Sequence, residues 1–260
     1  MRIGDRFDGY LIDLDGTVWV GSRPVPGAPE AIGALRSAGK AIAFVTNDSR
    51  ASAAGLAEQL RTIGIAAAPE DVLTAGAVTA RLAAESCGPS GAAFVIGSPA
   101  LHEEVAEAGL RLAAGEEGVG ADAVVVALHT EFSYAELRTA TLALAGGAKL
   151  FATNREPGLP MPDGTWPGTG AILAAVEYAS GATAIVGGKP ERHLFEEGRR
   201  LLGGAARVAV VGDGLASDIG GGAGAGLATI LVLTGNASRE QAETASPRPD
   251  QILDSIAALA

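Results

Sequence analysis

Cysteine and long apolar runs are scarce in this sequence, and each scarcity excludes a class of protein. The 260 residues contain one cysteine, Cys87, which cannot form an internal disulfide and has no neighbouring Cys or His at metal-ligand spacing. The longest apolar stretches, 124–128 and 229–233, are far shorter than the roughly 20 residues of a membrane-spanning helix. The first residues also lack the pattern of a signal peptide, so we expect a cytoplasmic protein without a membrane span.

Clusters of basic residues are also missing. The formal net charge is −11, and no basic run with interleaved aromatic residues interrupts it. This charge repels a phosphate backbone, so we expect no nucleic-acid partner. A small phosphorylated substrate is not excluded, because a bound divalent cation and one lysine can reverse the potential inside a single cleft.

What the sequence does contain is an alternation of apolar strand patterns with helical patterns that end at glycine. Near the amino terminus the expected order is strand, helix, strand, helix, strand, at 10–14, 28–38, 41–45, 51–63 and 71–73. Late in the chain, apolar runs before glycine-rich turns predict buried strands at 184–186, 208–211 and 229–233. This βαβ rhythm predicts an α/β fold, a doubly wound parallel sheet built from both ends of the chain.

A second α/β rhythm lies between these two ends. Strands are expected at 93–96, 123–127 and 150–152, with a helix opened by a capping box from Ser133 to Glu136. We interpret this stretch as an inserted domain. The prediction is a catalytic core made of residues 1–80 and 183–260, and an α/β cap made of residues 81–182.

Two acids, Asp13 and Asp15, stand at the end of the first expected strand, where open α/β sheets place their ligands. Strand alternation sends both side chains to one face. One carboxylate can attack phosphorus while the other protonates the leaving oxygen and later activates water. Solvated turn residues and simple cation ligands show the same spacing, so the pair alone leaves these alternatives open.

Three further groups follow other expected strands. Thr46 and Asn47 offer a hydroxyl and backbone N–H groups to phosphoryl oxygens, although the same residues can merely shape a turn. Lys189 follows two glycines, and its compact ammonium fits among carboxylates and phosphate better than a guanidinium would. Asp213 and Asp218 suit Mg²⁺, which prefers carboxylate oxygen; alternatively they cap the next helix, and both roles can coexist for Asp218.

Together, and in this order, these motifs resemble those of the haloacid dehalogenase superfamily. The matching segments are DLDGT at 13–17, Thr46, Lys189 and GDGLASD at 212–218. The resemblance implies that Asp13 is the nucleophile that forms an aspartyl phosphate and that Asp15 is the general acid and base. It also implies that Thr46 and Asn47 hold the phosphoryl group and that Lys189 neutralises charge. By the same resemblance, the cofactor is Mg²⁺, bound by Asp13, the backbone carbonyl of Asp15, Asp213 and Asp218.

The long interval between Asn47 and Lys189 resembles the NagD-like branch, whose cap is inserted at that point. Further similar segments are FATN at 151–154, PGTGAI at 167–172 and LVLTG at 231–235. The branch implies a phosphatase acting on a sugar phosphate, glycerol phosphate, nucleoside monophosphate or pyridoxal phosphate. It also leaves a homodimer through the cap as an option.

Cap residues are expected to choose the substrate. We predict that His129 and Asn154 bind it, from substrate-facing loops at 129–132 and 154–163, although a structural role for His129 is the alternative. Asp48, the pair Arg155-Glu156 and His129 depart from the usual pattern of the branch, so the substrate stays open. Two other functions are also kept: a phosphotransferase or mutase, and a non-catalytic module that binds a phosphorylated metabolite.

Overall fold

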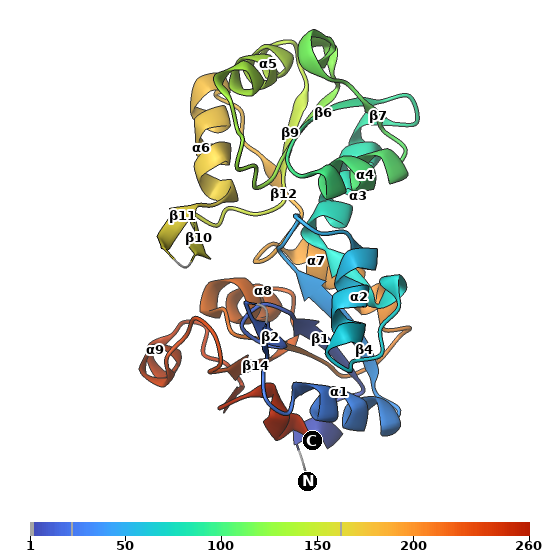
Figure 1. Cartoon of the computed structure of the whole chain (residues 1–260), viewed down its shortest axis with the longest axis vertical. Helices are drawn as coiled ribbons and strands as arrows, with labels where there is room; N and C mark the ends of the chain where they lie inside the picture. The colour runs from blue at the N-terminus through green and yellow to red at the C-terminus, as the bar shows by residue number, and fades with distance from the viewer. Residues whose placement is uncertain (1–2, 22, 162) are drawn as a thin grey trace. The chain divides into compact units, whose positions relative to one another are not determined.

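A computed structural model describes residues 3–21, 23–161 and 163–260 (Figure 1). Contacts divide the chain into two compact units. The first unit consists of residues 1–46, 53–73 and 189–260, and the second of residues 47–52 and 74–188. The chain therefore passes between the units several times, and neither unit is one continuous segment.

The first unit is built on a six-stranded sheet with the order β15-β14-β13-β1-β4-β5. Its strands are β1 (Gly9–Asp13), β4 (Ala41–Thr46), β5 (Val72–Thr74), β13 (Val208–Gly212), β14 (Ala228–Val232) and β15 (Gln251–Leu253). β1 pairs in parallel with both β4 and β13, and β14 pairs in parallel with β13 and β15. Every residue of β1 and β13 is buried, as expected for central strands of a parallel sheet covered on both faces.

The helices of the first unit are α1 (Ala28–Ser37), α2 (Ala53–Thr62), α7 (Arg192–Leu201), α8 (Gly221–Gly224) and α9 (Arg239–Thr244). Shorter turns are η1 (Ile3–Asp5), η2 (Pro69–Asp71), the π-helical η4 (Leu215–Gly220) and η5 (Ile256–Leu259), and β2 (Trp19–Val20) pairs with β3 (Arg23–Pro24). α7 packs on β1 and β4. A side chain at Gly198 of α7 would run into Leu11 of β1, so glycine allows this close approach.

The second unit has its own five-stranded sheet, with the order β12-β9-β8-β6-β7. Its strands are β6 (Ala92–Ile96), β7 (Arg111–Leu112), β8 (Ala123–Val126), β9 (Lys149–Ala152) and β12 (Ile185–Val186), and all paired neighbours run in parallel. The helices are α3 (Ala75–Cys87), α4 (Pro99–Glu107), α5 (Tyr134–Ala145) and α6 (Thr169–Ser180), with a short turn η3 (Gly115–Gly120). An antiparallel hairpin, β10 (Gly158–Met161) and β11 (Gly164–Pro167), precedes α6.

Helix pairs cover both faces of this second sheet. Alternate strand residues divide between two apolar clusters: Val124 and Val126 pack with residues of α5 and α6, whereas Val125 packs with residues of α3 and α4. Since successive side chains of a strand point to opposite faces, this division shows that the sheet lies between two helical layers. The structure thus confirms an α/β fold with parallel sheets.

One strand prediction was wrong in its pairing. We expected 184–186 to join the sheet that contains 208–211, but Ile185 and Val186 pair with Phe151 and Ala152 of β9 in the second unit. An apolar run identifies a strand without specifying its partner, and this two-residue strand carries little further information. The domain limits at 1–80, 81–182 and 183–260 stay a prediction; the contact units change at Thr74 and at Lys189.

The predicted capping box of α5 is confirmed. The Ser133 hydroxyl accepts a hydrogen bond from the Glu136 backbone N–H, and the Glu136 carboxylate accepts one from the Ser133 backbone N–H. Among the described residues, no helix has both the length and the apolar character that crossing a membrane requires.

Candidate active site

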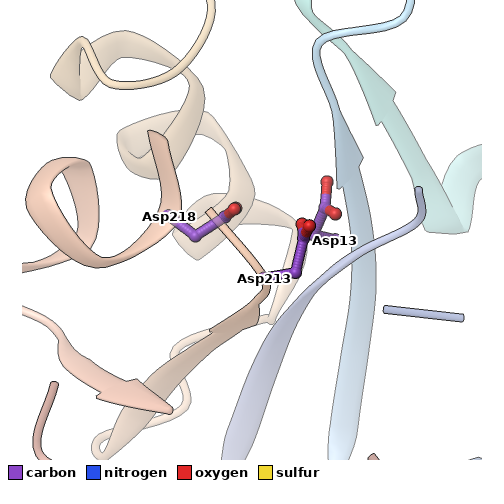
Figure 2. A group of neighbouring side chains, drawn as sticks. All are labelled: Asp13, Asp213 and Asp218. Carbon is purple, nitrogen blue, oxygen red and sulfur yellow. The ribbon is translucent and has the colours of Figure 1, made fainter. Parts of the chain in front are cut away.

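Three buried aspartates converge at the carboxyl ends of the central strands in the first unit. Asp13 is the last residue of β1, Asp213 follows β13, and Asp218 lies in η4. One carboxylate oxygen from each lies within 4.8 Å of the other two. Figure 2 shows the side chains of Asp13 and Asp213 close together, with that of Asp218 directed toward them. Parallel pairing of β1 with β13 brings these acids together across about two hundred residues of sequence.

The ammonium of Lys189 completes this cluster. Its Nζ lies 2.5 Å from Asp13 Oδ1 and 2.7 Å from Asp218 Oδ1, and the residue is only 3% exposed. The other oxygen of Asp13, Oδ2, accepts a 3.4 Å hydrogen bond from the Thr17 hydroxyl. Asp13 is therefore held from two sides, in a fixed position at the end of its strand.

Burial and mutual repulsion govern the protonation of the cluster. Burial raises the pKa of Asp13 well above its usual value; Lys189 opposes this effect, whereas Asp218 and Asp213 add to it. Burial also raises the pKa of Asp213. Burial alone would lower the pKa of Lys189, but the carboxylates of Asp13 and Asp218 outweigh it, so the pKa lies above the usual value and the amine stays charged. Without a further cation, the site disfavours three ionised carboxylates.

Tight turns fit around Asp213. Gly16 has a φ of 81°, a conformation that favours glycine, and a side chain there would collide with the Asp213 carboxylate. The backbone N–H of Asn236 donates to Asp213 Oδ2 at 2.6 Å, and the Thr234 hydroxyl donates to the Gly16 carbonyl oxygen, also at 2.6 Å. The loop after β14 therefore fixes both Asp213 and the turn after β1.

Asp218 has two structural functions at once. Its Oδ2 accepts hydrogen bonds from the Gly214 backbone N–H and the Ser217 hydroxyl, each at 3.0 Å, which stabilises the turn that opens η4. Its Oδ1 contacts Lys189. We considered that Asp218 caps the next helix; instead it lies inside η4, whose N-cap is Gly214, and its carboxylate accepts the Gly214 N–H while it takes part in the cluster.

Asp15 and Thr46 occupy the same sheet edge in different environments. Asp15 is exposed, and its Oδ1 accepts a 3.1 Å hydrogen bond from the indole N–H of Trp19. Trp19 itself is buried, so it offers a rigid donor. Thr46 is the last residue of β4 and is buried. The two acids of the first motif therefore differ in environment, since Asp13 is buried and Asp15 is exposed.

The donor set fits a hard divalent cation. Three carboxylates and one ammonium leave two net negative charges in a buried space, and all available ligand atoms are oxygens. Mg²⁺ prefers such oxygens and keeps part of its water shell. Asp13 and Asp213 present their oxygens to this space, while Asp218 shares its carboxylate with Lys189.

In the second unit, Asn47 and Asn154 are brought together with Glu156. The Asn47 side-chain N–H donates to Glu156 Oε1 at 2.8 Å, and the Asn154 side-chain N–H donates to the Asn47 carbonyl oxygen at 3.3 Å. The Glu156 backbone N–H donates to Asn154 Oδ1 at 3.0 Å. Two residues predicted to bind substrate are therefore joined by a third that the sequence had marked only as a departure.

His129 lies beside the first turn of α5. Its Nε2 lies 3.2 Å from Glu136 Oε1, the acid of the α5 capping box. This contact supports the structural alternative for His129, while its role in substrate binding stays a prediction. Asp48, the other departure, forms a two-point ion pair with Arg50, and Arg155 forms one with Glu177 of α6.

Several contributors to the site had not been assigned a role from the sequence. Thr17 lies inside the first motif, so its position signalled a function there, and Thr234 and Asn236 stand at the end of the LVLTG segment or just beyond it. Their contacts to Gly16 and Asp213 depend on strand order. No pattern in the neighbouring sequence predicts such contacts.

Comparison with known proteins gives a consistent result. A family described as haloacid dehalogenase-like hydrolase matches residues 10–111, and a related HAD-like hydrolase family matches residues 186–259. Human Chronophin is 41% identical over 252 residues, covering 92% of this chain and 85% of its own. D-glycerol 3-phosphate phosphatase of Mycobacterium tuberculosis is 39% identical over 253 residues, covering 96% and 70%. The crystal structure of glycerol phosphate phosphatase from the same organism in complex with magnesium superposes with a TM-score of 0.92 at 37% identity, covering 100% of this chain and 78% of that one.

Proposed function

This chain belongs to the haloacid dehalogenase-like hydrolase family, and from that premise we propose that it is a Mg²⁺-dependent phosphatase in which Asp13 is the nucleophile. It is a phosphatase of phosphorylated small molecules, as the similarity along almost the whole chain establishes. The observation that carries the mechanism is the position of Asp13, whose buried carboxylate contacts Lys189 within the cluster of three aspartates.

The reaction takes two displacements. A carboxylate oxygen of Asp13 attacks phosphorus, and the bond from phosphorus to the leaving oxygen breaks as Asp15 gives that oxygen its proton. Water then attacks phosphorus, the bond to Asp13 breaks, and Asp15 takes the proton that the water loses. The exposed position of Asp15 leaves it open to proton exchange with water, and the hydrogen bond from Trp19 fixes the orientation of its carboxylate.

Lys189 and the metal are the proposed sources of positive charge at the site. Lys189 favours the ionised form of Asp13, because its ammonium contacts that carboxylate and opposes burial, which raises the pKa of Asp13. Mg²⁺, when bound by Asp13, Asp213, Asp218 and the Asp15 carbonyl oxygen, supplies charge stabilisation for the phosphoryl oxygens. Thr46 and Asn47 are the proposed donors to these oxygens.

The relatives suggest where the substrate search should start. Since a relative at 39% identity is named D-glycerol 3-phosphate phosphatase, glycerol 3-phosphate is our first candidate. Sugar phosphates, nucleoside monophosphates and pyridoxal phosphate complete the panel. The cytoplasmic location and a homodimer through the second unit stay part of this proposal, and gel filtration tests the latter.

Replacing the nucleophile tests the mechanism. Asp13→Asn keeps nearly the same shape, so we expect it to fold while losing activity by about a thousandfold or more, the scale of loss seen when a member of a catalytic triad is removed. The measurement is phosphate release from p-nitrophenyl phosphate and from the panel, with and without Mg²⁺. Substantial activity in Asp13→Asn would contradict the assignment of the nucleophile, and release of a phosphorylated alcohol in place of inorganic phosphate would indicate a phosphotransferase.

A further inference from the structure

Trp19 is tied to Asp15, the proposed general acid, through both its side chain and its backbone. The indole N–H donates to Asp15 Oδ1 at 3.1 Å, and the Trp19 carbonyl oxygen accepts the Gly16 backbone N–H at 2.7 Å. The Trp19 backbone N–H donates to the Leu14 carbonyl oxygen at 3.2 Å, and Asp15 and Trp19 also form an isolated parallel bridge. The backbone is therefore held to Trp19 on both sides of Asp15.

The indole that contacts Asp15 is itself rigidly placed. Trp19 is only 3% exposed, and it lies in β2, where it is the register partner of Pro24 in β3. Beyond this pairing, the Val25 backbone N–H donates to the Val18 carbonyl oxygen at 2.8 Å. A buried indole N–H normally has a hydrogen-bond partner, and here that partner is an exposed carboxylate. A buried, immobile donor thus orients an acid at the surface.

The turn that carries Asp15 also lies against the aspartate cluster. A side chain at Gly16 would collide with the Asp213 carboxylate, and the Thr234 hydroxyl donates to the Gly16 carbonyl oxygen at 2.6 Å. Asp13, the proposed nucleophile, stands two residues before Asp15 and ends β1. All of these residues belong to the first unit, so the orientation of the Asp15 carboxyl is defined in the same compact unit as the cluster.

Orientation matters for an acid that must deliver a proton to one particular atom. The torsion that turns a carboxyl group about its Cβ–Cγ bond is broad, so an exposed aspartate samples many orientations unless a contact restrains it. Proton transfer requires the acid to lie within hydrogen-bond distance of the leaving oxygen. A fixed donor on one carboxyl oxygen restricts the torsion and lowers the entropy lost on reaching the transition state. Removing the indole N–H should therefore slow a step that needs this proton.

We propose that Trp19 is a positioning residue that orients the Asp15 carboxyl through its indole N–H and thereby determines how efficiently the enzyme cleaves phosphate esters of weakly acidic alcohols. This inference rests on the proposed function of Asp15 as the general acid. When the bond from phosphorus to the leaving oxygen breaks, the electron pair stays on that oxygen, which takes the proton of Asp15. A weakly acidic alcohol needs the proton in order to leave, whereas p-nitrophenolate is stable as an anion.

Trp19→Phe tests the role, because it keeps a large apolar ring and removes the N–H. The readout is kcat/KM, which compares free enzyme and substrate with the transition state, for two esters of similar size. Phenyl phosphate releases a phenol with a pKa of about 10, and p-nitrophenyl phosphate releases a stronger acid. We expect kcat/KM to fall about tenfold for phenyl phosphate and less than about twofold for p-nitrophenyl phosphate. Each protein is measured at the pH of its own maximum activity, so that a change in protonation does not enter.

A double-mutant cycle shows whether the effect passes through Asp15. Asp15→Asn keeps an oxygen that can accept from the indole but has no acidic proton, so it should impair phenyl phosphate more than p-nitrophenyl phosphate. Adding Trp19→Phe to it should cause no further loss. Tyr10→Phe is the matched control, since it removes a buried aromatic hydroxyl of the same unit that donates to the Gly4 carbonyl oxygen at 3.0 Å. It should leave the ratio of the two kcat/KM values unchanged.

If Trp19→Phe does not fold, β-(3-benzothienyl)alanine at position 19 makes the same test, because sulfur replaces the N–H within the same ring outline. Equal losses for the two esters would overturn the proposal, as would an unchanged kcat/KM for phenyl phosphate or full additivity in the cycle. A failure of the proposed function would appear separately, as wild-type protein without Mg²⁺-dependent hydrolysis, Asp13→Asn with wild-type activity, or Asp15→Asn that cleaves phenyl phosphate as well as the wild type does.

Discussion

The buried ammonium of Lys189 affects the ionisation of carboxylates in the aspartate cluster of the first unit. Lys189 contacts Asp13 and Asp218 directly, and both partners are almost fully buried. Breaking such an arrangement by removing one partner usually destabilises a protein by about 3–5 kcal/mol, because the remaining charges are left buried without compensation.

Lys189→Met should therefore lower the free energy of unfolding by about 3–5 kcal/mol in the presence of a chelator. Mg²⁺ should return part of this loss, since a cation in the cluster offsets the same charges. Urea denaturation with EDTA and with Mg²⁺ measures both quantities. Lys189→Arg is the matched control: it keeps the charge but changes the shape, so it should lose activity with a smaller loss of stability. Equal stability of Lys189→Met and wild type would contradict this account.

For individual residues, the sequence predicted which residues belong to the cluster better than it predicted which side chains contact one another. The two acidic motifs and the lysine were identified from their spacing, and the structure brings Asp13, Lys189, Asp213 and Asp218 together. The contact between Lys189 and Asp13 spans 176 positions, so its existence depends on the whole topology. Glu156 was visible only as an unusual residue, because its partner Asn47 lies 109 positions away.

Between elements, a buried acid joins α3 and α4. Glu104 of α4 accepts a hydrogen bond on Oε1 from the hydroxyl of Thr74, which caps the amino terminus of α3. Its Oε2 lies against Gly76 and, within the described part of the chain, has no hydrogen-bond partner. Burial raises the pKa of Glu104 to about 7; the Thr74 hydroxyl opposes this effect, and Glu107 and Glu103 add to it.

This acid should make stability depend on pH. Since the folded pKa of about 7 lies above the ordinary value of 4.5, the folded state binds the proton more tightly than the unfolded state. The contribution is fully present below about pH 4.5 and is lost as the pH rises to about 7, by about 3 kcal/mol in total. Unfolding in urea across this range, compared between wild type and Glu104→Gln, measures it.

Glu104→Gln should show a flatter pH profile and greater stability than wild type at pH 8. The matched control is Glu85→Gln on α3, an exposed acid that is not among the groups that raise the pKa of Glu104, so the profile should stay that of wild type. A Glu104→Gln profile that parallels the wild type would show that another group is responsible.

Element by element, the strands and helices that were predicted lie within a residue or two of their observed ends, whereas α3, α4, α6, α7, α8 and α9 were not predicted. The pairing of β12 was wrong, because an apolar run does not name its neighbour. The segment 154–163 was expected to be a substrate-facing loop, but it contains β10, which pairs with β11. Pro160 in this segment argues against a strand when only sequence is considered.

The whole molecule carries a formal charge of −11, so cations can stabilise it either by screening or by binding at a specific site. Diffuse screening acts with any salt, whereas a bound ion acts by mass action and contributes about 2.7 kcal/mol at a hundredfold excess over its dissociation constant. Thermal unfolding should therefore shift upward with millimolar Mg²⁺ and fall again with EDTA.

Two controls separate the mechanisms. NaCl at matched ionic strength should give a smaller shift, and Asp213→Asn, which removes one carboxylate charge from the cluster, should lose most of the Mg²⁺ effect. If NaCl reproduced the whole shift, the stabilisation would come from screening and not from the aspartate cluster.

The strand order of the first unit also bears on biosynthesis. β1 precedes the other described strands of its sheet along the chain and is therefore made before them, yet it lies at the centre of that sheet, with β4 on one side and β13 on the other. Nascent chains shorter than about residue 208 therefore present β1 with an open edge, although the segment 74–188 of the second unit is already complete. Unpaired edges are sites of aggregation, so a ribosome that stalls in this interval would release a product in need of a chaperone.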